Sequence, residues 1–183
     1  MVMIPGLRQS VNEYLAGIED LTRQELVWGA VVQEPSPWLQ HQGIVTRAVV
    51  LLDQHVRERR AGLVCVSPID VVLDEARALV LQPDVVFVSH ERAGILRNQV
   101  WGAPDLVVEV ESPGTRRRDR TLKLRWYRQY GVREYWLIDP QEAVVTVMAL
   151  DGERVRRRRF RGHRRLVSPL LPGFHETAAT FFE

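Results

Sequence analysis

A long amphipathic segment most constrains how this chain can fold. Between residue 38 and about residue 60, apolar side chains recur at intervals of three and four positions: Ile44, Val45, Ala48, Val49, Leu52 and Val56. That spacing places them on one face of an α-helix, and Gly62 follows where the helix would end. A helix with one apolar face must bury that face against another element. The Val-rich segments that come next predict a β-sheet as this partner.

Further strands and helices alternate along the rest of the chain. Strands or hairpin arms are expected over residues 25–34, 63–73, 79–89, 105–111, 133–138, 143–150 and 154–160. Other helices are expected over residues 10–19 with Ser10 as N-cap, 91–96, 116–130 with Gly131 after its end, and 177–182. This order predicts one domain over residues 1–183, of class α/β or α+β, with a mixed β-sheet flanked by helices.

The composition indicates in which compartment the protein is expected. Hydrophobic residues make up 45% of the chain, yet no run of about 18 apolar residues occurs, so no membrane span is expected. The first ten residues lack the apolar segment of a secretory signal. Cys65 is the only cysteine, which excludes an internal disulfide and predicts a buried thiol. We therefore expect a cytoplasmic protein.

Three carboxylates share one face of the strand expected over residues 105–111. Alternation on a strand puts Asp105, Glu109 and Glu111 on the same side. Like charges this close repel one another, and burial adds to the free energy needed to keep them ionised. A divalent cation such as Mg²⁺ or Mn²⁺ would relieve both effects. The alternative is an acidic face exposed to solvent.

Another carboxylate, Asp84, opens the apolar run of residues 85–88 one strand earlier. Neighbouring strands lie about 4.8 Å apart. If these two strands pair, Asp84 and Glu109 could hold one metal ion between them. The alternative is that Asp84 is an ordinary residue at the surface end of a strand.

Lysine occurs once in the chain, at position 123, beside 24 arginines. Lysine differs from arginine in being a compact point charge whose pKa can shift on burial. On the expected helix, Lys123 lies at the edge of the apolar stripe formed by Leu122, Trp126 and Tyr130. From that edge its side chain can extend toward the sheet. The alternative is a surface ion pair with Asp119.

Arginines concentrate in two clusters. The first consists of Arg116, Arg117, Arg118 and Arg120, and the second contains eight arginines between residues 154 and 165. Clusters of this kind can contact nucleic-acid phosphates. The alternative for each is a solvated strand or loop face.

The order of these residues resembles the PD-(D/E)xK nuclease superfamily, and more closely the Uma2 family of restriction-endonuclease-like proteins. The resembling segments are residues 82–89, 102–115, 119–140 and 168–174. The resemblance implies a restriction-endonuclease-like fold, with Asp84 and Glu109 as metal ligands and Lys123 as the catalytic lysine. Glu111 stands where the usual superfamily motif has its lysine, whereas the Uma2 pattern supplies the lysine from the following helix, as Lys123 does.

The Uma2 pattern also includes a Glu-Leu-x-x-Gly-Glu stretch followed by a histidine. The corresponding stretch here is residues 25–30, in which Glu25 is retained and Ala30 replaces the second acid. His41 follows where the histidine is expected. The resemblance thus adds Glu25 and His41 to the candidate catalytic residues, although His41 could equally be a core or surface residue of its helix.

Together with the resemblance, these residues predict a metal-dependent endonuclease that hydrolyses phosphodiester bonds, with DNA as the expected substrate and Mg²⁺ (or Mn²⁺) as the cofactor. One alternative is a nucleic-acid-binding module without catalysis, which Ala30 and Glu111 suggest. Another is a partner-binding domain in which Trp28, Trp38 and Trp101 line an interface. A homodimer is expected because enzymes that cut both strands of a duplex often work as pairs.

Overall fold

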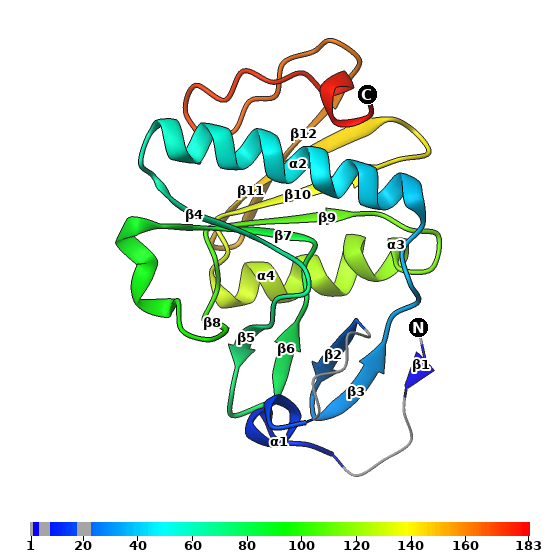
Figure 1. Ribbon diagram of the computed structural model, residues 1–183, viewed down its shortest axis with the longest axis vertical. Coiled ribbons are helices and arrows are strands. Elements are labelled where there is room, and N and C mark those ends of the chain that lie inside the picture. Colours follow the sequence, from blue (N-terminus) through cyan, green and yellow to red (C-terminus); the bar gives the residue numbers. More distant parts are fainter. Residues whose placement is uncertain (1, 4–7, 18–22) are drawn as a thin grey trace.

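The computed structural model describes residues 2–3, 8–17 and 23–183, and two β-sheets dominate this part of the chain (Figure 1). The larger sheet has the strand order β12-β11-β10-β9-β7-β4. Its strands are β4 (Gly62–Val66), β7 (Val85–Ser89), β9 (Leu106–Val110), β10 (Glu134–Asp139), β11 (Val144–Asp151) and β12 (Arg154–Arg161). Neighbours run antiparallel except β9 and β10, which are parallel. The predicted mixed sheet of an α+β fold is therefore confirmed.

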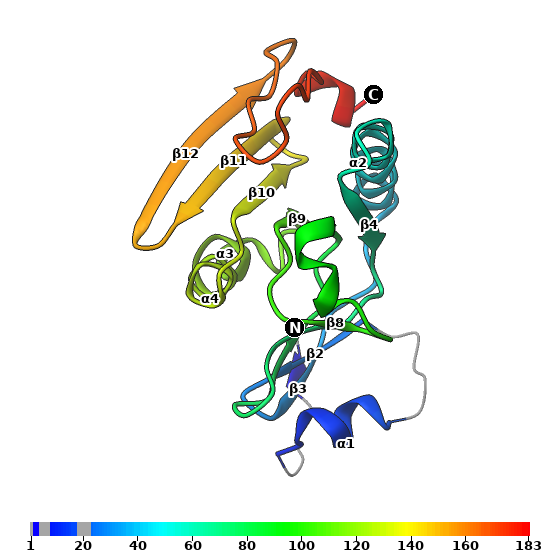
Figure 2. The ribbon, with the colours of Figure 1, turned by 90° about the vertical axis from the view of Figure 1, so that its left-hand side faces the viewer.

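Helices cover both faces of this larger sheet (Figure 2). Helix α2 (Leu39–Glu58) lies on one face, as the apolar spacing predicted. The other face carries a continuous helical segment made of α3 (Arg116–Arg118), the π-helical turn η2 (Asp119–Lys123) and α4 (Leu124–Tyr130). This segment connects the parallel strands β9 and β10, which a tight turn cannot do. Gly131 ends it with a φ of 90°, in the left-handed conformation expected of a helix-ending glycine.

The alternation of side chains on β9 decides which groups face which helix. Leu106, Val108 and Val110 belong to the apolar cluster that includes α2. Val107 belongs to the cluster that includes α4. Glu109 shares the face of Val107, because alternate residues of a strand point the same way. Its carboxylate therefore points toward the helical segment that contains η2.

The smaller sheet has the order β1-β3-β2-β6-β5-β8. Its strands are β1 (Val2–Met3), β2 (Gln24–Val27), β3 (Ala30–Gln33), β5 (Val71–Asp74), β6 (Leu79–Leu81) and β8 (Val100–Trp101). Helix α1 (Val11–Leu15) packs against it, and the predicted N-cap Ser10 accepts a 3.2 Å hydrogen bond from the Glu13 N–H. The last two positions of the helix predicted over residues 10–19 lie outside the described residues.

Two predicted strands are each divided between the two sheets. The segment 63–73 forms β4 and β5, and the segment 79–89 forms β6 and β7. Pro68 and Pro83 lie at the two breaks. Proline has no N–H to donate to a neighbouring strand, so a sheet ladder stops there and the chain can cross to the other sheet.

The remaining predicted helices are short 3₁₀ turns, η1 (His90–Ile95) and η3 (Ala179–Phe181). Cys65 is a free thiol, half-buried in β4. Among the described helices, none combines the length and the apolar character needed to cross a membrane.

Candidate active site

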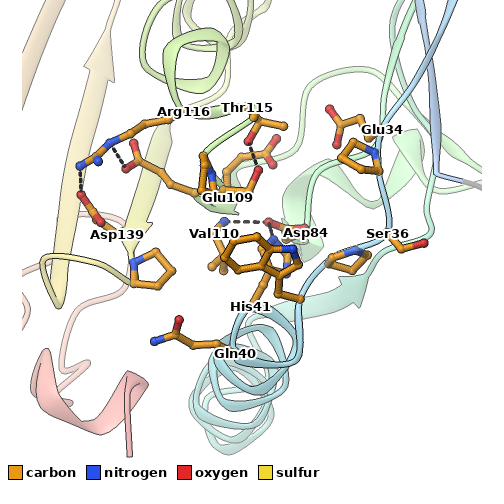
Figure 3. A pocket seen from close by; sticks show the side chains of 18 of the residues that line it. Glu34, Ser36, Gln40, His41, Asp84, Glu109, Val110, Thr115, Arg116 and Asp139 are labelled. Carbon is orange, nitrogen blue, oxygen red and sulfur yellow. Dashed lines mark hydrogen bonds and ion pairs between the residues drawn. The ribbon is translucent and has the colours of Figure 1, made fainter. Parts of the chain in front are cut away.

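Two carboxylates meet because strands β7 and β9 pair antiparallel. Val85 lies opposite Val108, so the next pair outward is Asp84 and Glu109. The Val110 N–H donates a 2.7 Å hydrogen bond to Asp84 Oδ2 (Figure 3). Both carboxylates are almost completely buried. The strand pairing on which a shared metal site depended is therefore present.

Lys123 approaches Glu109 from the π-helical turn η2. Its Nζ lies 2.8 Å from Glu109 Oε1 and 3.1 Å from Glu25 Oε1, and its side chain is 1% exposed. A π-helical turn shifts the phase of the helix relative to an α-helical turn. Leu122 is accordingly exposed, not part of the core as predicted. The alternative of a surface pair with Asp119 is wrong, because both of these side chains are buried.

Arg23 places a guanidinium among three carboxylates. Its Nη1 lies 2.6 Å from Asp84 Oδ1, its Nη2 lies 3.5 Å from Glu109 Oε2, and its Nε lies 3.2 Å from Glu34 Oε2. Neither Arg23 nor Glu34 was predicted as a site residue from the sequence. The register of the β2–β3 hairpin could have revealed them, because they form the pair one position beyond its last paired residues.

Glu25 and Arg118 extend this buried network. Glu25 accepts a 3.2 Å hydrogen bond from the Gln82 N–H and forms an ion pair with Arg118. Arg118 Nη1 also lies 3.0 Å from Glu34 Oε1. Arg118 thus points into the interior, which leaves it out of any nucleic-acid contact that we propose.

His41 joins the network from the first turn of α2. Its Nε2 lies 3.3 Å from Asp84 Oδ2, and its buried Nδ1 has no hydrogen-bond partner among the described residues. Burial alone would raise the pKa of Asp84, but Arg23, His41 and the Val110 N–H outweigh it and bring that pKa down to about 2. Asp84 is therefore ionised at neutral pH.

The network holds more negative than positive charge. Its five acids are Glu25, Glu34, Asp84, Glu109 and Asp119, and its three permanent cations are Arg23, Arg118 and Lys123. Five negative charges less three positive charges leave two negative charges when every acid is ionised. Burial raises the pKa of Glu109 to about 8 although Lys123 opposes the change, and the nearby Asp84 and Asp119 contribute to the rise. Either a proton or a further cation would offset this charge.

These groups line a pocket that opens to solvent (Figure 3). His41, Asp84, Glu109 and Lys123 are buried in its wall, and Arg23 is half-buried there. The other lining residues come from the segments 34–40, 110–116 and 139–141. A substrate could therefore reach the carboxylates and the lysine from outside.

The structure does not bring Asp105 to this pocket. Asp105 lies four residues before Glu109, which corresponds to about 13 Å along a strand. There it accepts a 2.8 Å hydrogen bond from the Ser89 N–H and lies 3.2 Å from Arg133 Nη1. Sharing a strand face with Glu109 therefore does not bring Asp105 within reach of the pocket, and we leave Asp105 out of the proposed ligand set.

Glu111 lines the pocket but is already neutralised by arginines. Arg120 donates to both of its carboxylate oxygens, at 2.5 Å and 2.7 Å. Arg116 lies 3.4 Å from Glu111 and also pairs with Asp139. Arg117 is exposed. The first arginine cluster thus contributes Arg116 to the pocket wall.

The three tryptophans considered for an interface differ in exposure. Trp28 packs edge-on against Trp126, with ring centroids 5.8 Å apart, and Arg97 lies over the ring of Trp101. Both are half-buried. Trp38 is 71% exposed and lines the pocket.

Metal binding can be tested against this geometry. Within the part of the chain that the structure describes, no three His, Cys, Asp or Glu side chains are grouped to hold a metal ion directly. Asp84 and Glu109 nevertheless both contact the guanidinium of Arg23, which is a positive charge between two carboxylates. Oxygen ligands and an excess of two negative charges suit one divalent cation. The residues therefore fit Mg²⁺ or Mn²⁺ in donor chemistry and in charge.

Comparison with known proteins identifies the family and supports the fold. The family model of Uma2, described as "Putative restriction endonuclease", matches residues 11–180. The fold is similar to the crystal structure of "a putative nuclease belonging to DUF820" from Anabaena variabilis, with a TM-score of 0.80. That likeness covers 95% of this chain and 97% of that chain at 20% identity, so it concerns the fold alone. No curated relative matches the chain.

Proposed function

Since this chain belongs to the Uma2 family, whose description is that of a restriction endonuclease, we propose that it is a metal-dependent endonuclease acting on DNA. The observation that carries the proposal is the buried pair Asp84 and Glu109. These carboxylates come from adjacent strands, share one guanidinium and lie in a pocket beside Lys123, the only lysine of the chain. Carboxylates and a lysine in one pocket are suited to the hydrolysis of a phosphodiester bond.

Asp84 and Glu109 are the proposed ligands of Mg²⁺ or Mn²⁺. Such an ion, when bound, polarises a phosphate group and lowers the pKa of a coordinated water. Tyr127 is a positioning residue, because its hydroxyl donates a 2.8 Å hydrogen bond to Glu109 Oε1. His41 orients Asp84 in the same way from the other side of the pair.

Lys123 acts as a hydrogen-bond donor and a fixed positive charge. Burial would lower its pKa, but Glu109 and Glu25 outweigh burial and raise the pKa well above its ordinary value. A lysine that stays protonated cannot accept the proton of the attacking water. It can orient that water and stabilise the negative charge that develops on the phosphate. Glu25 contributes by holding the Lys123 ammonium in place.

Titration calorimetry of Mn²⁺ tests the proposal. Asp84→Asn and Glu109→Gln should each remove Mn²⁺ binding and DNA cleavage while circular dichroism shows an intact fold. Asp105→Asn is the matched control, because Asp105 is a buried, ion-paired acid next to the same strand but outside the pocket. Measurements are repeated with DNA present, since weak metal sites can require substrate. Binding that persists in both pocket variants would refute the metal site.

A nucleic-acid-binding module without catalysis is the second candidate. It is favoured by Arg23, which already pairs with both proposed metal ligands. In that case the wild type would retain DNA at low salt and would not cleave it in Mg²⁺ or Mn²⁺. Metal-dependent cleavage that disappears in an Asp84→Asn variant, with an intact fold by circular dichroism, would exclude this candidate.

A further inference from the structure

Strand β12 presents an unusual density of positive charge. Six of its eight residues are arginine, and β12 is the edge strand of the larger sheet. All six of these side chains are exposed. Charged residues on an edge strand hinder it from pairing with another sheet, and a few charges are enough to do so. The six arginines therefore exceed what protection of the edge requires.

The pairing of β12 with β11 divides the arginines between two faces. Phe160 and Arg158 lie opposite Val145 and Val147, which pack in the cluster that includes α2. Because side chains alternate between the two faces of a strand, Arg154 and Arg156 point to the same face as Arg158. We call Arg154, Arg156 and Arg158 the α2-side arginines. Arg157 lies opposite Met148, which packs in the cluster that includes α4. By the same alternation, Arg159 and Arg161 share this second face with Arg157. We call Arg157, Arg159 and Arg161 the α4-side arginines.

The α4-side arginines are connected to the pocket through Glu142. One carboxylate oxygen of Glu142 accepts hydrogen bonds from Arg159 at 2.9 Å and from Arg161 at 2.7 Å. The other oxygen lies 3.7 Å from Arg116 Nη2. Arg116 lines the pocket together with Gln141, the neighbour of Glu142. A half-buried arginine at the pocket wall, Arg116, is thus linked through Glu142 to the exposed arginines of β12. Strand β12 lies at the edge of the sheet (Figure 2).

We propose that the α4-side arginines bind the phosphodiester backbone of a nucleic-acid strand that leads out of the pocket. Guanidinium groups bind phosphate oxygens through paired hydrogen bonds. Arginines at alternate positions of a strand repeat about every 6.6 Å, so they can contact successive phosphates of an extended strand. A second copy of β12 is a poorer occupant, because pairing would set arginine against arginine. The identity of the ligand rests on the proposed nuclease function.

Two triple variants that remove the same charge test this proposal. R157Q/R159Q/R161Q removes the α4-side arginines, and R154Q/R156Q/R158Q removes the α2-side arginines of the same strand. Circular dichroism checks that both fold. Fluorescence anisotropy then measures the affinity of each protein for a labelled DNA duplex at several salt concentrations, without divalent ions. We expect the α4-side variant to lose about 10- to 100-fold in affinity, and its salt slope to fall by about 2 to 3, with little change in the control.

The outcomes separate this proposal from the proposed function. Equal losses in the two triple variants would overturn it, because net charge alone would then explain binding. Absence of wild-type binding to both the DNA duplex and an RNA duplex at low salt would overturn it too. If the α4-side variant loses affinity as expected but the wild type cleaves no DNA with Mg²⁺, the nuclease function is refuted and the arginine site is still supported. The same assay with an RNA duplex identifies which backbone is bound, and a loss confined to the α4-side variant on either duplex supports the proposal.

Discussion

Replacing Lys123 with methionine should destabilise the fold strongly. The Lys123 ammonium lies 2.8 Å from Glu109 and 3.1 Å from Glu25, and its side chain is 1% exposed. Removing one partner of a buried ion pair leaves the other charge without compensation, which costs about 3–5 kcal/mol. Methionine is close to lysine in length, so the loss reflects charge more than an empty volume. For a chain of this size, such a change lowers Tm by about 2–4 °C per kcal/mol.

A double-mutant cycle with Glu109→Gln isolates the contribution of the pair. Glu109→Gln alone leaves Lys123 in contact with Glu25, so its effect on stability should be the smaller one. In the Lys123→Met background, the same change removes an unpaired carboxylate and should restore part of the stability. We expect the two changes to differ from additivity by about 1–3 kcal/mol.

Urea unfolding followed by circular dichroism measures the four proteins of the cycle. Arg57→Met is the control, because Arg57 forms a solvent-exposed ion pair with Asp53 that should contribute little to stability. The loss in Lys123→Met should grow as the pH rises through about 8, the pKa of Glu109, because below that pH Glu109 is protonated and carries no charge that needs a partner. Additive free energies, or a Lys123→Met effect no larger than that of the control, would refute the reasoning.

Three further predictions follow from individual side chains. The pKa of Glu109 is about 8, and a carboxylate must lose its proton to bind a metal ion. The affinity for Mg²⁺ measured by calorimetry should therefore rise about tenfold per pH unit up to about pH 8 and then stay constant. An affinity that does not change with pH would contradict Glu109 as a ligand. Burial raises the pKa of Glu134 above its value in the unfolded chain, although hydrogen bonds from Ser168 and Trp136 oppose the change. Protonated Glu134 therefore stabilises the fold at low pH, and this contribution is lost as the pH rises through the pKa of the folded state. Thermal unfolding between about pH 4 and about pH 7 should therefore show wild type losing stability relative to Glu134→Gln, and a constant difference would contradict this. Trp38→Ala should change stability by less than about 0.5 kcal/mol because the indole is exposed, yet weaken DNA binding in the anisotropy assay if the ring stacks on a base at the pocket.

Local patterns in the sequence were sufficient for much of the fold. The three- and four-residue spacing predicted α2, because an amphipathic helix is encoded in consecutive residues. The two hairpin arms expected over residues 143–150 and 154–160 correspond to β11 and β12, because these strands are adjacent in the chain. The single lysine and the acid-bearing strand pointed to Lys123 and Glu109, which the structure places 2.8 Å apart.

Tertiary structure alone decided how these parts meet. The pairing of β7 with β9 sets Asp84 opposite Glu109, and it joins segments that are about 25 residues apart with no local signal of their register. The π-helical turn buries Lys123 and exposes Leu122, which an α-helical periodicity could not predict. Arg23 and Glu34 enter the site because strand β2 of their hairpin pairs with β6, from which the chain continues through Asp84 into β7. Sequence periodicity determines which face of an element a residue occupies, but contacts between distant elements determine which faces come together.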